Sequence, residues 1–117
     1  MKASSRQLTP IRIGIIALTL ATAAIHLLLA FAFPDPMFTT MFILNALGYL
    51  ALLVAYFLPQ LDRYHSLVRW LLIAFAAVTV VGYFVFNASN FINPLSLVAK
   101  AIEVVLIVLL FLDGRGN

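Results

Sequence analysis

Four long apolar runs dominate the chain, over residues 11–33, 37–58, 67–86 and 94–112. Each run is close to the roughly 20 residues that a helix needs to cross about 30 Å of hydrocarbon. Unpaired backbone groups are too costly in lipid, so a spanning run must be a helix or a strand of a closed barrel. Barrel strands are shorter and alternate apolar with polar residues, which these runs do not do. The runs therefore predict four transmembrane helices.

The composition supports the prediction of four transmembrane helices. Hydrophobic residues make up 65% of the 117 residues and charged residues only 9%, whereas soluble domains are about 25% charged. The low charged fraction therefore argues against a soluble enzyme, a DNA-binding domain and a disordered tail. Cysteine is absent, which excludes disulfides, thiol catalysis and cysteine-ligated metals. The net charge of +3 comes from basic residues that mostly flank the apolar runs, so it indicates membrane orientation and not nucleic-acid binding.

The connections between the runs are short, so consecutive helices are expected to be antiparallel neighbours. Thr9-Pro10, Asp35-Pro36 and Asn93-Pro94 each place an N-cap residue before a proline at the first helical position. Pro59 disfavours helical geometry at Leu58 and is expected to end the second helix. We therefore expect a single transmembrane domain over residues 1–117, an all-α integral membrane protein with a four-helix antiparallel bundle.

The basic residues predict the orientation. Six of them lie on one side of the predicted bundle: Lys2, Arg6, Arg12, Arg63, Arg69 and Arg115. The connections on the other side carry Asp35 and no basic residue. Because cytoplasmic segments are enriched in lysine and arginine, both termini are expected to face the cytoplasm.

Polar residues inside the spans are the candidate functional residues. Lys100 and Glu103 lie in the fourth run, and His26, Asn45 and Thr79 lie in the first, second and third. At 1.5 Å per residue, all five are roughly 9 to 14 Å from the outer helix ends. Four helices thus place polar groups in the outer half of the bilayer, where we expect a buried polar network. Lys100 and Glu103 share one helix face at this spacing and can pair, which lowers the cost of intramembrane charge.

Three functions are compatible with these residues. The first is a non-enzymatic accessory or structural subunit of a larger membrane complex, or a homo-oligomer, since the sequence contains no nucleotide loop, catalytic constellation or metal cluster. The second is a small proton-coupled carrier that uses Glu103. The third is a cofactor-binding protein in which His26 ligates a haem iron or a chlorophyll magnesium, or contacts a quinone.

Three segments carry a resemblance to known proteins: residues 23–28 (AAIHLL), 42–50 (FILNALGYL) and 94–100 (PLSLVAK). Together they resemble a group of small prokaryotic four-span membrane proteins that are uncharacterised. The resemblance covers most of the chain. It implies a four-helix fold and a location in the prokaryotic inner membrane, and it implies no activity.

Overall fold

The computed structural model of the chain describes residues 8–32, 35–87 and 94–115. Within these ranges the regular structure is entirely helical: α1 (Pro10–Ala32), α2 (Pro36–Phe57), the 3-10 helix η1 (Pro59–Tyr64), α3 (His65–Asn87) and α4 (Pro94–Arg115). Four of these helical segments, with η1 joined to α3, are long and apolar enough to cross a membrane. The predicted all-α class with four membrane helices is confirmed.

Local chemistry explains where the helices begin and end. The Thr9 hydroxyl accepts a hydrogen bond from the Arg12 backbone N–H at 3.2 Å, and the Asp35 carboxylate accepts one from the Met37 N–H at 2.9 Å. These caps satisfy N–H groups that have no partner in the first helical turn. Leu58 is extended (φ −75°, ψ 122°), as expected for a residue before proline, and it ends α2.

Two helix ends differ from the predicted boundaries by more than one residue. α3 begins at His65 instead of 67, because η1 leads directly into it. α4 continues to Arg115 instead of ending at 112. The prediction followed hydropathy, but a helix does not end where the apolar run ends, because backbone hydrogen bonding continues through polar residues. The extension brings Asp113 into α4.

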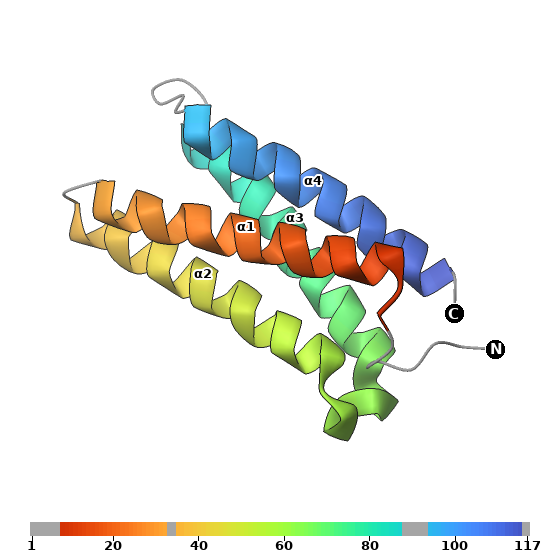
Figure 1. The fold of residues 1–117 in the computed structure, drawn as a ribbon. Coiled ribbons are helices and arrows are strands. Elements are labelled where there is room, and N and C mark those ends of the chain that lie inside the picture. The colour runs from red at the N-terminus through yellow and green to blue at the C-terminus, as the bar shows by residue number, and fades with distance from the viewer. Residues whose placement is uncertain (1–7, 33–34, 88–93, 116–117) are drawn as a thin grey trace.

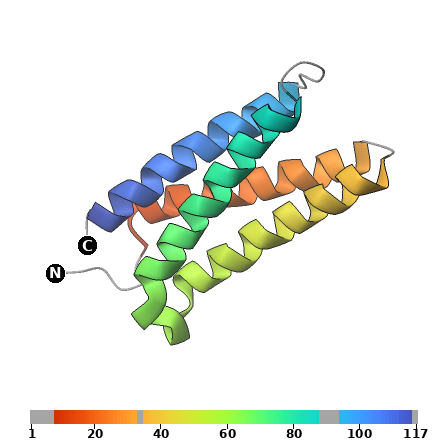
Figure 2. The same ribbon diagram turned by 180° about the vertical axis from the view of Figure 1, so that it is seen from behind.

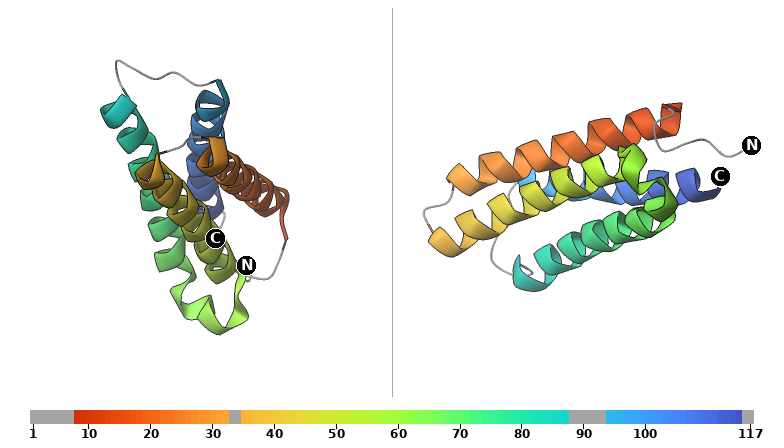
Figure 3. Two further views of the ribbon diagram at one scale, coloured as in Figure 1. Left: turned by 90° about the vertical axis from the view of Figure 1, so that its left-hand side faces the viewer. Right: turned by 90° about the horizontal axis from the view of Figure 1, so that it is seen from below.

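The four helices form an up-and-down bundle (Figure 1). The start of α1, the end of α4 and η1 lie at one end of the bundle, which we call the terminal end; the other is the hairpin end. At the hairpin end α1 lies beside α2 and α3 beside α4, whereas at the terminal end α1 lies beside α4 and α2 beside α3 (Figures 1 and 2). Among the described residues, the backbones of the diagonal pairs α1–α3 and α2–α4 are not close neighbours. The four helices surround a central core (Figure 3).

The core is built by residues spaced alternately three and four apart. On α1 these are Arg12, Ile15, Thr19, Thr22, His26 and Leu29. On α4 they are Ser96, Ala99, Glu103, Leu106, Leu110 and Asp113. This spacing is typical of helices that pack side by side at shallow angles. The opposite faces carry large exposed apolar side chains such as Leu28, Val54, Val78 and Val105, which suits contact with lipid.

Candidate functional site

The first buried polar group lies in the hairpin half and is centred on Glu103, which is 0% exposed. Lys100 Nζ lies 2.7 Å from Glu103 Oε1, one turn earlier on the same helix. Lys100 is itself buried, and its ammonium group lies 5.4 Å from the centre of the Tyr83 ring. An isolated charge at this depth would cost several kcal/mol, and this pairing offsets much of that cost.

Glu103 also connects α4 to α2. The Tyr49 hydroxyl donates a hydrogen bond to Glu103 Oε2. Asn45, one turn before Tyr49 on α2, donates from Nδ2 to the Thr79 hydroxyl of α3 at 2.9 Å, and Thr79 donates in turn to the Phe75 carbonyl at 2.8 Å. The contacts thus link α4, α2 and α3 at one level of the bundle.

His26 reaches the same region from α1. Its Nδ1 lies 2.7 Å from the Thr22 carbonyl oxygen; because a carbonyl can only accept, Nδ1 carries a proton and donates it. Its ring packs 6.0 Å from that of Phe42 and 6.1 Å from that of Tyr49. The charges on Lys100 and Glu103 also act on it electrostatically.

The structure therefore places the five predicted site residues as follows. Lys100 pairs with Glu103, and Asn45 bonds to Thr79. Tyr49, one turn after Asn45 on α2, bonds to Glu103. The His26 ring packs on that of Tyr49, and its described hydrogen bonds are to Thr22. We call this group, His26, Asn45, Tyr49, Thr79, Lys100 and Glu103, the hairpin-end cluster. Tyr49 was not among the residues predicted for this network.

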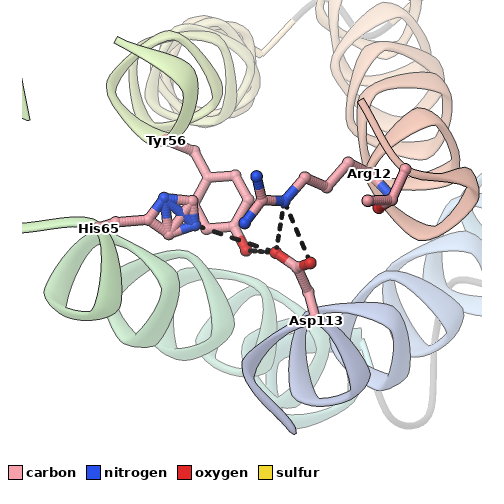
Figure 4. Close-up of polar contacts among 5 residues, drawn as sticks. Arg12, Tyr56, His65 and Asp113 are labelled. Carbon is pink, nitrogen blue, oxygen red and sulfur yellow. Dashed lines mark hydrogen bonds and ion pairs between the residues drawn. The ribbon is translucent and has the colours of Figure 1, made fainter. Parts of the chain in front are cut away.

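A second buried polar group lies at the terminal end, and each helix contributes one residue to it (Figure 4). Arg12 Nε donates to both carboxylate oxygens of Asp113, at 3.1 Å each. The Tyr56 hydroxyl donates to Asp113 Oδ2. His65 Nε2 lies 3.9 Å from the same oxygen, and the His65 ring lies 4.1 Å from that of Tyr56. We call Arg12, Tyr56, His65 and Asp113 the terminal-end cluster.

Sequence reasoning missed this cluster. Arg12 was interpreted only as an orientation signal, His65 was assigned to a connection, and Asp113 lay beyond the predicted end of its helix. Arg12 is 0% exposed, so it is a core residue as well as part of the basic flank. One signal was available: Arg12 lies fourteen residues before His26, and Asp113 ten residues after Glu103, on the same core-facing stripes as these predicted residues.

Apolar residues separate the two clusters. Every helix contributes to this layer, which contains Ile15, Leu53, Leu72, Ala76, Leu106 and Leu110. Glu103 and Asp113 are ten residues apart on α4, or about 15 Å along the helix axis. Two buried hydroxyl groups lie in the intervening segment of α1: that of Thr22, 3.4 Å from His26 Nδ1, and that of Thr19, which has no hydrogen-bond partner among the described residues. The two clusters are therefore distinct sites.

Each cluster contains a carboxylate between a cation and a phenol hydroxyl, with a histidine ring against the phenol. Such a set can hold helices in register or exchange a proton. In the described part of the chain, no three histidine, cysteine or carboxylate side chains gather as a metal site would require. Two shallow apolar hollows lie on the described surface, one along α3 and one between α1 and α2, and neither is lined by His26.

Comparison with known proteins places the chain in a family. A family model described as a family of unknown function (DUF7475) matches residues 2–112. The chain belongs to this family. The prediction of an uncharacterised family is confirmed, and the DUF7475 match covers α1, α2 and α3 and most of α4. No curated protein and no solved structure matches the chain.

Proposed function

We propose that this DUF7475 protein is a non-enzymatic accessory subunit of a larger membrane assembly. The observation that supports this proposal is the internal pairing of its buried charges, Arg12 with Asp113 and Lys100 with Glu103. A catalytic or transport centre has to present such groups to a substrate or to water. Here Arg12 and Glu103 are both 0% exposed, and their charges serve contacts between and within helices.

The outer surface supports a role in assembly. On the hairpin half of α3, a shallow apolar hollow is lined by Ala77, Val78, Val81, Gly82 and Val85. A Cβ atom added at Gly82 would meet no atom within 4 Å. Small and β-branched residues on a lipid-facing surface allow a neighbouring transmembrane helix to approach closely. This face of α3 is where we expect a partner helix to pack, either from another subunit or from a second copy.

The test is purification of the full chain from its native membrane in a mild detergent, followed by mass spectrometry. We expect a second membrane protein, or a second copy, at fixed stoichiometry. Gly82→Leu should reduce this recovery severalfold, because it fills the hollow while leaving the bundle core untouched. Ala24→Leu, on the exposed face of α1, is the matched control and should not. A single monodisperse species without partner would contradict the proposal.

The orientation and the membrane are part of the same proposal. The terminal end carries the basic residues Arg63, Arg69 and Arg115, which favours a cytoplasmic location for both termini and, with the family resemblance, the inner membrane of a prokaryote. Because the chain has no cysteine, single cysteines at Gln60 and at Met37 can be labelled separately. An impermeant maleimide added to intact cells should label Met37→Cys and not Gln60→Cys.

A second candidate is proton-coupled transport through Glu103. The contacts that favour it are those to Lys100 and Tyr49, two groups that can exchange protons with a carboxylate. In liposomes with a pH gradient, the intact protein should then carry protons together with a solute, and Glu103→Gln should abolish this flux. Flux that survives the substitution would remove the candidate.

A further inference from the structure

Arg69 occupies an unusual position at the terminal end of the bundle. It is only partly exposed, and its guanidinium carbon lies 4.8 Å from the centre of the Trp70 ring. The guanidinium group packs directly against Gly114 of α4, where a Cβ atom would overlap with it. Arg69 thus bridges α3 and α4 near the level at which a membrane protein meets lipid headgroups.

No carboxylate of the described residues pairs with this guanidinium group. The described ion pairs join Arg12 and His65 to Asp113, and Lys100 to Glu103. Asp113 is the nearby buried acid, and both of its oxygens already accept hydrogen bonds from Arg12. A partly buried guanidinium group at a membrane interface is stabilised by an anion, and it matches the geometry of a phosphate particularly well. Within the part of the chain that the structure describes, Arg69 therefore supplies a positive charge without a paired carboxylate.

The groups around Arg69 are suited to a lipid. Trp70 and Phe111 are 48% and 42% exposed, and their rings meet edge to face at 5.4 Å. Arg115 is exposed at the end of α4, one turn beyond Phe111 and on the same helix face. The cations thus lie toward the headgroup region and the aromatic rings lie beside them, where the glycerol and upper acyl segments of a phospholipid would be.

We propose that Arg69, Trp70, Phe111, Gly114 and Arg115 form a binding site for an anionic phospholipid in the leaflet at the terminal end. Arg69 and Arg115 contact the phosphate, and the Trp70–Phe111 pair contacts the start of the acyl chains. Gly114 is required because its missing side chain allows the guanidinium group to rest on α4. The site is independent of the accessory role proposed above, since it needs no protein partner.

The single tryptophan of the chain lies in the site and reports directly on lipid contact. The full chain is reconstituted in phosphatidylcholine vesicles that contain phosphatidylglycerol with brominated acyl chains, which quench Trp70 fluorescence on contact. The reverse mixture, with bromine on phosphatidylcholine, corrects for random contact. We expect phosphatidylglycerol to be enriched at Trp70 severalfold over its fraction in the bilayer.

Three variants separate a site from general charge attraction. Arg69→Gln should lower the relative binding constant of phosphatidylglycerol about fivefold, as expected for one basic residue near an anionic surface. Gly114→Ala should lower it similarly although it changes no charge, because its Cβ atom displaces the guanidinium group. Arg63→Gln removes the same charge from an exposed position over the Tyr64 ring and should change the constant less than twofold.

The following results would contradict the proposed lipid site. Equal losses in Arg63→Gln and Arg69→Gln, with none in Gly114→Ala, would mean that only net charge matters and would overturn it. Unchanged quenching in both site variants would also overturn it. Inorganic phosphate titrated into detergent-solubilised protein should not alter Trp70 fluorescence at concentrations comparable to the lipid; if it does, the site binds phosphate and not a phospholipid. Circular dichroism of each variant verifies the helical fold, and Arg69→Lys replaces Arg69→Gln if the latter fails to fold.

Discussion

The two buried clusters contain the same kinds of side chain but join the helices in different ways. In the terminal-end cluster the ion pair runs from Arg12 on α1 to Asp113 on α4, and all four helices contribute a residue. In the hairpin-end cluster the ion pair lies within one turn of α4, and only uncharged donors and ring contacts extend from it to the other helices. An ion pair between two helices stabilises their packing against each other, whereas an ion pair within one helix only lowers the cost of burying the two charges. We therefore expect the terminal-end cluster to contribute more to stability.

The largest effect is expected for Asp113→Ala. The substitution removes the described counterion of the fully buried Arg12 and the acceptor of the Tyr56 hydroxyl. Breaking a buried pair in this way costs roughly 3–5 kcal/mol of unfolding free energy. The loss can be measured by titrating the protein from mild detergent into sodium dodecyl sulfate and following circular dichroism. Asp62→Ala, which removes an exposed carboxylate, is the control and should cost less than about 0.5 kcal/mol.

A double variant tests whether the charge itself is responsible. When Arg12→Met is combined with Asp113→Leu, no buried charge is left uncompensated, and most of the stability should return. A double variant as unstable as Asp113→Ala would show that side-chain packing, and not the ion pair, makes this end important.

A smaller loss, about 2 kcal/mol, is expected for Glu103→Gln, which loses one charge-assisted hydrogen bond and a pairing partner. Lys100 loses its counterion, but its long side chain can extend toward the hairpin end, since only six residues separate it from Pro94 at the start of α4. The same detergent titration measures the loss, and Lys100→Met combined with Glu103→Gln should restore part of it. If Glu103→Gln proves as costly as Asp113→Ala, the distinction between the two clusters is wrong.

The comparison also explains what the sequence could predict. The four helices follow from hydropathy and length, because lipid allows few other structures for such runs. Lys100 and Glu103 stand out because charges within an apolar run are costly, and Asn45 and Thr79 follow from the depth estimate. In each case the residue is unusual for its local surroundings.

Arg12 and Asp113 are not unusual locally, because charged residues are expected at the ends of membrane helices. Their significance comes from a contact between residues 101 positions apart, which requires α1 and α4 to be neighbours at the terminal end. Hydropathy does not give that arrangement, and it gave a fourth helix that ended at 112, before Asp113. His65 was missed for a related reason, since η1 and α3 are continuous where a connection was predicted.

The smallest effect is expected for the uncharged contact between α2 and α3. Asn45→Ala removes the hydrogen bond to Thr79 at 2.9 Å, and interhelical bonds of this kind are worth about 0.6 kcal/mol in membranes. It also removes the Asn45 Oδ1 atom, a buried acceptor without a partner, which offsets part of the loss. Thr79→Val keeps the buried Asn45 Oδ1 atom and also removes the acceptor of the Asn45 Nδ2 group. Two buried polar groups of Asn45 then lack a partner, so Thr79→Val should be the more destabilising of the two variants. Detergent titration of both variants gives the order. The opposite order, with a larger loss of unfolding free energy in Asn45→Ala than in Thr79→Val, would contradict this prediction. It would mean that the Asn45 carbonyl makes a stabilising contact, and that the hairpin-end cluster contributes more to the packing of α2 than the described hydrogen bonds indicate.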